Sequence, residues 1–172
     1  MKKGSSEIEL AMKEAIKLEI EGHKFFTKAA EITTHPKGKR MFQHLAQEEV
    51  KHLETFKGIF KKALKGEEGK DYLKEEIRGE APLVEKLKER IKGQEGKGEI
   101  EALSIGMELE KRAIELFRDS ASKAEDPVAR EIFLKILDEE KFHYDLLQAQ
   151  YDSLTHSGFW LDSAEFRMDG KW

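Results

Sequence analysis

The 172-residue chain contains no cysteine and only three prolines. Without cysteine it can form no disulfide, no cysteine-ligated zinc site and no iron–sulfur or rubredoxin-type centre. It also lacks long hydrophobic runs: nowhere do eighteen apolar residues follow one another, and no signal-peptide stretch follows the basic residues at 1–3. These absences predict a soluble, cytoplasmic protein without a membrane span.

Charge is abundant but is not concentrated in one sign. Charged residues make up 38% of the chain and hydrophobic residues another 38%, with a formal net charge of -4. A weakly acidic chain without a basic stripe is not expected to bind nucleic acid. So much charge with so little proline predicts long helices whose outer faces are charged.

Apolar residues recur in steps of three and four over four long segments, which is typical of the helices of a bundle. These helices are expected at about 5–33, 36–65, 98–123 and 127–154. The connection at 66–98 is rich in glycine, and a short helix is expected within it at about 83–92. Such a length suits a crossing along the bundle, since a helix of ~20 residues spans ~30 Å.

The predicted fold is therefore all-α: an antiparallel four-helix bundle over residues 1–155, with a long crossover between the second and third long helices. Residues 156–172 form a tail that carries four aromatic side chains: Phe159, Trp160, Phe166 and Trp172. Disordered tails are poor in aromatic residues. We expect this tail to lie on the bundle or on a partner subunit.

Six polar residues interrupt the apolar faces of the four long helices. They are Glu19, Glu49, His52, Glu110, Glu140 and His143. Each Glu-x-x-His pair places its side chains about 60° apart on a helix, so that both point the same way. By the same periodicity, Glu21 and Glu108 are expected to face solvent.

The two halves of the chain match when residue numbers are shifted by 91. The matching pairs include Glu19/Glu110, Glu49/Glu140, His52/His143, Phe26/Phe117, Pro36/Pro127, Phe42/Phe133 and Glu48/Glu139. No gap is needed between residues 11 and 52 of the first half. The repeat predicts one helical hairpin used twice, with two equivalent polar sets facing each other across a pseudo-twofold axis.

Four unpaired carboxylates in one core would be costly, and their mutual repulsion would force some of them to protonate. Taken singly, each residue is most simply interpreted as a core residue paired with a neighbouring helix. Taken together they lack basic partners, because no apolar seam carries Lys or Arg. Two divalent cations would resolve the conflict, and this oxygen-rich donor set suits iron or manganese better than copper or a closed structural zinc.

The pattern resembles that of di-iron and di-manganese carboxylate bundles, which take one Glu from each of two helices and Glu-x-x-His from the other two. Residues 18–26, Leu-Glu-Ile-Glu-Gly-His-Lys-Phe-Phe, and 48–52, Glu-Glu-Val-Lys-His, are similar to the first two helices of rubrerythrin-like proteins in the ferritin-like superfamily. The resemblance covers roughly residues 5–155. It implies that the six residues bind two metal ions per chain, most simply iron and alternatively manganese, with Glu49 and Glu140 bridging.

Three positions depart from the rubrerythrin pattern, besides the missing rubredoxin domain. Ala113 stands where those proteins carry an additional carboxylate, and Phe26 and Phe117 stand where a tyrosine is often found. The ligand set is therefore nearer to that of bacterioferritins. His23 is one turn after Glu19 and is a candidate additional ligand, but the repeat does not support it. The other histidines without a repeat partner are expected to be exposed: His35, His44 and His156.

The resemblance implies a di-iron oxidoreductase that reduces hydrogen peroxide or dioxygen. Such an enzyme would need an external electron-donor protein, and the family likeness and the aromatic tail favour a homodimer. Three alternatives stay open on the sequence alone. They are a ferroxidase or iron-storage subunit, a manganese catalase-like enzyme, and a metal-free helical bundle that serves as a binding scaffold.

Overall fold

The computed structural model describes residues 3–63, 78–79 and 81–162. Within these residues the elements are helices: α1 (Lys3–Ile32), α2 (Pro36–Ala63), α4 (Pro82–Ile91), α5 (Gly98–Lys123) and α6 (Pro127–Ser157). None of the helices so described combines the length and the apolar composition needed to cross a membrane. The predicted short helix at 83–92 corresponds to α4.

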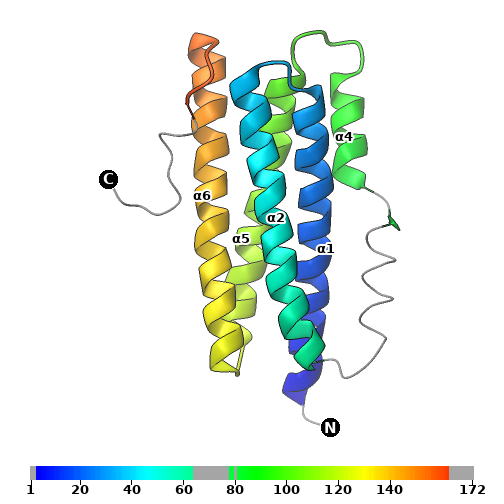
Figure 1. The fold of residues 1–172 in the computed structure, drawn as a ribbon, viewed down its shortest axis with the longest axis vertical. Coiled ribbons are helices and arrows are strands. Elements are labelled where there is room, and N and C mark those ends of the chain that lie inside the picture. Colours follow the sequence, from blue (N-terminus) through cyan, green and yellow to red (C-terminus); the bar gives the residue numbers. More distant parts are fainter. Residues whose placement is uncertain (1–2, 64–77, 80, 163–172) are drawn as a thin grey trace.

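The four long helices lie side by side, which confirms the predicted all-α bundle (Figure 1). Helices α1 and α6 run in one direction, and α2 and α5 run in the other. Because α2 and α5 are parallel, the chain between them must return along the bundle before α5 begins. Helix α4 lies in this connection and packs against α1 and α5. Residues 66–77 of the predicted crossover lie outside the described residues.

Both ends of α6 are set by local side-chain and backbone chemistry. The Asp126 carboxylate accepts hydrogen bonds from the backbone N–H groups of Val128 (3.3 Å) and Ala129 (3.2 Å), as expected of a helix N-cap. The helix ends at Ser157 rather than near residue 154, so the predicted end was wrong by almost one turn. The reason is Gly158, which adopts φ +74° and terminates the helix in the left-handed conformation that glycine favours.

Two layers of large buried side chains lie inside the bundle. The first layer consists of Phe26, Phe42 and Leu147, and the second consists of Phe56, Phe117 and Phe133. The rings of Phe26 and Phe42 stack at 6.3 Å, and those of Phe56 and Phe117 at 5.5 Å. The shift of 91 maps Phe26 onto Phe117, Phe42 onto Phe133 and Phe56 onto Leu147, so every pair joins one layer to the other. The pseudo-twofold axis of the repeat therefore passes between the two layers.

Trp160 ties the segment after α6 to the opposite hairpin. Its Nε1 donates to Oε2 of Glu99 at 3.1 Å, and Oε1 of Glu99 accepts from the backbone N–H groups of Thr34 (2.9 Å) and His35 (3.2 Å). The indole ring covers Gly38, where a Cβ atom would come within 2.5 Å of it. This part of the predicted tail thus lies on the bundle, and residues 163–172 lie outside the described residues.

Candidate metal centre

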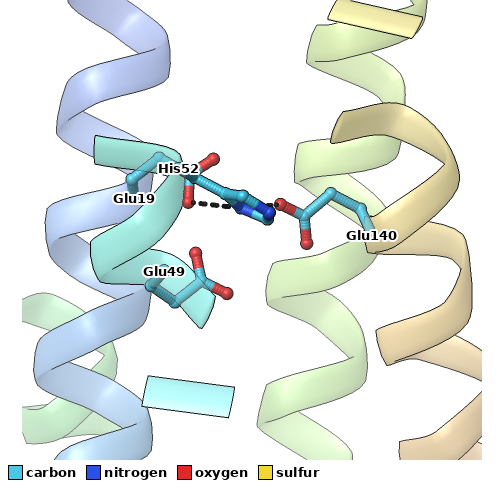
Figure 2. Close-up of side chains that lie close together, drawn as sticks. All are labelled: Glu19, Glu49, His52 and Glu140. Carbon is cyan, nitrogen blue, oxygen red and sulfur yellow. Dashed lines mark hydrogen bonds and ion pairs between the residues drawn. The ribbon is translucent and has the colours of Figure 1, made fainter. Parts of the chain in front are cut away.

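The six polar residues predicted from the sequence converge between the two aromatic layers. They come from all four long helices: Glu19 from α1, Glu49 and His52 from α2, Glu110 from α5, and Glu140 and His143 from α6. Each of them is at most 3% exposed. Figure 2 shows the His52 ring lying between Glu19 and Glu140, with Glu49 nearby.

The donor atoms form two overlapping groups, in each of which they lie within 4.8 Å of one another. The first group contains Glu19, Glu49, His52 and Glu140, and the second contains Glu49, Glu110, Glu140 and His143. Only Glu49 and Glu140 belong to both groups. This is the arrangement expected of two neighbouring ion positions that share two carboxylates.

Both imidazoles turn the same nitrogen toward the carboxylates. Nδ1 of His52 lies 3.3 Å from Oε2 of Glu19 and 3.0 Å from Oε1 of Glu140. Nδ1 of His143 lies 3.1 Å from Oε2 of Glu140 and 3.6 Å from Oε1 of Glu110. The two Nδ1 atoms are therefore the nitrogens available to a bound metal, and the Nε2 atoms point away from the centre.

One oxygen of each of three carboxylates is buried without a hydrogen-bond partner. These atoms are Oε1 of Glu19, Glu49 and Glu110, whereas Oε1 of Glu140 lies 3.0 Å from Nδ1 of His52. Buried polar atoms in folded proteins are almost always paired, so three unpaired oxygens in one small volume fit a site that binds cations. Carboxylate oxygens and imidazole nitrogens are the donors that divalent iron and manganese accept. The residues present therefore fit a pair of such ions.

Burial and mutual repulsion raise the pKa of three of the four carboxyl groups in the metal-free protein. Burial is the main factor that raises the pKa of Glu49, and the charges of Glu19 and Glu140 add to it. Burial likewise raises the pKa of Glu110 and of Glu19. These shifts favour the neutral forms of the three groups over four adjacent negative charges.

Glu140 is the exception, because it lies between the two imidazoles. Burial favours its neutral form, but hydrogen bonds from His143 and His52 hold the pKa of Glu140 well below its usual range. Burial alone would lower the pKa of each histidine, yet their carboxylate partners raise the pKa of His52 to about 12 and that of His143 to about 10. Protons on the imidazoles thus occupy the place of the metal ions, and metal binding must release them.

Comparison with known protein families agrees with this geometry. The family model described as Rubrerythrin matches residues 8–151, a range that includes all six polar residues. The chain belongs to the rubrerythrin family. Searches of curated proteins and of solved structures returned no match. The family and the two buried groups together indicate a di-metal carboxylate protein with a ferritin-like bundle.

Sequence reasoning missed one residue of this rubrerythrin centre. Glu139, which directly precedes Glu140, accepts a hydrogen bond from Nε2 of His52 at 2.8 Å. Its side chain is 28% exposed, so it links the buried ring to the surface of the bundle. The repeat carried the signal, since Glu139 and Glu48 are equivalent positions directly before the two shared carboxylates.

One expectation about the surroundings of the centre was wrong. Glu21 was expected to face solvent, but its side chain is only 10% exposed and pairs with Arg112 of α5 at 3.4 Å. Helix periodicity gives the direction of Glu21 but not the neighbouring helix that covers it. Glu108 is exposed as predicted and pairs with Lys86 and Arg90.

The remaining histidines take no part in the two groups. Nδ1 of His23 lies 2.9 Å from the backbone carbonyl oxygen of Ala46, so the ring is engaged away from the carboxylates. His23 is therefore not among the residues that this rubrerythrin centre brings together. The other three are exposed, as expected: His35, His44 and His156.

A glycine gives the shared carboxylate Glu49 its space. A Cβ atom on Gly22 would lie 3.1 Å from Cδ and from Oε2 of Glu49, closer than ordinary contact. We expect Gly22→Ala to leave the bundle folded, since alanine favours a helix over glycine by about 1 kcal/mol. We also expect it to displace Glu49 and to weaken binding of Co²⁺ about tenfold or more in a calorimetric titration.

Gly58→Ala provides the matched control for this change. Gly58 lies on α2, and nothing lies within 4 Å of the position its Cβ would take. This control gains the helix preference without crowding the centre, so it should bind Co²⁺ as the unchanged protein does. Equal affinities for the two variants would contradict the assigned role of Gly22.

Proposed function

We propose that the protein is a di-iron carboxylate oxidoreductase that reduces hydrogen peroxide or dioxygen. The observation that supports this most is the pair of overlapping donor groups with three unpaired carboxylate oxygens. Two ferrous ions held there would supply two electrons, which with two protons reduce hydrogen peroxide to water or dioxygen to hydrogen peroxide. An external donor protein would have to return those electrons, because the chain has no cysteine for a rubredoxin-type centre.

The charges of the donor set favour two divalent ions over one. Four ionised carboxylates would carry four negative charges, which two divalent cations would balance, while the two imidazoles would bind as neutral ligands through Nδ1. The proton of each imidazole would then reside on Nε2, where Glu139 lies 2.8 Å from that atom of His52. A neutral set of this kind can be buried without the cost of net charge.

The two aromatic layers determine what else enters the centre. Phe26 and Phe117 are fully buried, one in each layer. Both are apolar rings at positions where rubrerythrins often have a tyrosine with its polar hydroxyl group. Apolar layers on both sides exclude water and strengthen the electrostatic interactions between them. A small neutral oxidant such as hydrogen peroxide or dioxygen suits this setting better than a charged or bulky substrate.

The proposal is tested with the protein loaded anaerobically with ferrous iron and mixed rapidly with hydrogen peroxide. We expect the bound iron to be oxidised much faster than the same concentration of free ferrous iron, as followed by absorbance in a stopped-flow instrument. A parallel reaction with dioxygen compares the two oxidants. A rate no faster than that of free iron would refute the proposed activity, and metal analysis of protein purified without added metal distinguishes iron from manganese.

A further inference from the structure

His52 and His143 resemble each other at Nδ1, which faces the carboxylates, and differ at Nε2, which points away from them. Nε2 of His52 donates to Oε2 of Glu139 at 2.8 Å. Nε2 of His143 is fully buried and has no hydrogen-bond partner among the described residues. The shift of 91 makes Glu48 the equivalent of Glu139. If the two halves were equal, Glu48 would therefore be the residue that supports His143.

Lys51 explains why Glu48 does not take this role. The Glu48 carboxylate forms an ion pair with the Lys51 ammonium group, one turn further along α2. The Glu48 side chain is 8% exposed and that of Lys51 is 69% exposed, so a surface lysine engages the buried Glu48 carboxylate where Glu139 has an imidazole as its partner. The residue equivalent to Lys51 in the second half is Phe142, which cannot form an ion pair. The Glu139 carboxylate thus remains available to His52.

We infer that the two ion positions bind metal with unequal affinity, and that Lys51 causes the difference by holding Glu48 away from His143. This inference rests on the proposed di-metal centre. A carboxylate on the far nitrogen of a histidine ligand fixes the ring and keeps its proton there, which leaves the inner nitrogen free for the metal. His52 has this support from Glu139, whereas His143 has none. The position served by His52 is therefore the tighter one.

The test is a titration of the metal-free, full-length protein with Co²⁺ alone, followed by calorimetry and by the visible absorption of bound cobalt. The unchanged protein should show two separate steps of one ion each. Their dissociation constants should differ by about 10- to 100-fold, the usual effect of losing such a supporting group. Glu139→Ala should weaken the tighter step by a similar factor, so that the two steps merge.

Two further variants separate this inference from a purely structural effect. Glu48→Ala is the control equivalent to Glu139→Ala, and it should leave both steps unchanged because Glu48 supports neither imidazole. Lys51→Phe introduces the residue found at the equivalent position of the second half. It should release Glu48 and strengthen only the weaker step, with a change in the spectrum of the second cobalt ion.

Several outcomes would overturn the inference. Two equal steps in the unchanged protein would do so, as would equal effects of Glu139→Ala and Glu48→Ala. A structural role alone would change the unfolding temperature of the metal-free variants while preserving the ratio of the two affinities. Failure to bind cobalt at all would overturn the proposed di-metal centre as well, so the two failures are distinguishable.

Discussion

Replacing Glu140 by Gln is expected to abolish metal binding and also to destabilise the metal-free protein. Glu140 belongs to both donor groups and contacts both imidazoles. Its pKa is lowered, so its charge balances the protonated histidines when no metal is bound. Removing one partner of such a buried arrangement costs about 3–5 kcal/mol. Urea unfolding of the metal-free Glu140→Gln variant measures this loss.

Glu49→Gln is the matched comparison, and we expect it to separate metal binding from stability. Glu49 also belongs to both donor groups, but burial raises its pKa well above the usual range, which favours the neutral carboxyl group in the metal-free protein. An amide of the same shape replaces a neutral acid at little cost, so the metal-free stability should change by less than about 1 kcal/mol. Peroxide reduction should still fall by at least about 100-fold, because a shared ligand is lost. Equal destabilisation by the two variants would contradict the assigned protonation states.

The second large effect concerns how the stability of the protein changes with pH. We expect bound metal to reverse the direction of this change. Without metal, the protein should become less stable as the pH rises from about 6 to about 9. The pKa of His143 is about 10 and that of His52 about 12 in the folded protein, against 6.5 for an ordinary histidine. The folded state therefore binds more protons than the unfolded state in this range, and its stability falls with rising pH.

The carboxyl groups of the centre do not cancel this trend. The raised pKa values of Glu49 and Glu110 act in the same direction, since both groups stay protonated above the ordinary value of 4.5. The pKa values of Glu139 and Glu140 are lowered, so the stability that these two contribute is lost only as the pH falls below about 4.5. That range lies below the interval from pH 6 to pH 9 in which the fall in stability is expected.

Bound metal should invert the trend, because the ligands bind only when deprotonated. At a free metal concentration about 1,000 times the dissociation constant, binding adds about 4 kcal/mol of stability. For a chain of this size that corresponds to about 10 °C in unfolding temperature. Scanning calorimetry at pH 6 and pH 9, with and without Co²⁺, measures both trends. A metal-free unfolding temperature that rises over this range would contradict the assigned proton distribution.

The long helices and the convergence of the six polar residues could be predicted because two independent patterns agreed. Helical periodicity alone places Glu19 on an apolar face, where a single glutamate has many explanations. The shift of 91 gives it an equivalent, Glu110, and joins both to the two Glu-x-x-His pairs. Packing of the four helices then leaves only one place in which these residues can meet.

The surroundings of the centre were harder to predict, since they depend on contacts between helices rather than along them. Glu139 and Glu21 both lie off the apolar seams, yet one contacts His52 and the other is covered by Arg112. Periodicity states the direction of such a side chain, but the neighbour that it meets is determined by the packing of another helix. The contact of Trp160 with Glu99 was equally hard to predict. Trp160 comes two residues after Gly158, where α6 ends in the left-handed conformation, so helical periodicity no longer gives the direction of its side chain.

The repeat also has a consequence for the ancestry of such a chain. Two copies of the first hairpin, paired as the two halves pair here, would already bring together four glutamates and two histidines. Such a symmetric ancestor would carry Lys51 twice, and each Glu48 would be held in the same way. In a single chain each half can differ from the other, as Lys51 in the first half and Phe142 in the second show. Joining the two copies would thus allow the two proposed metal positions to diverge by single substitutions.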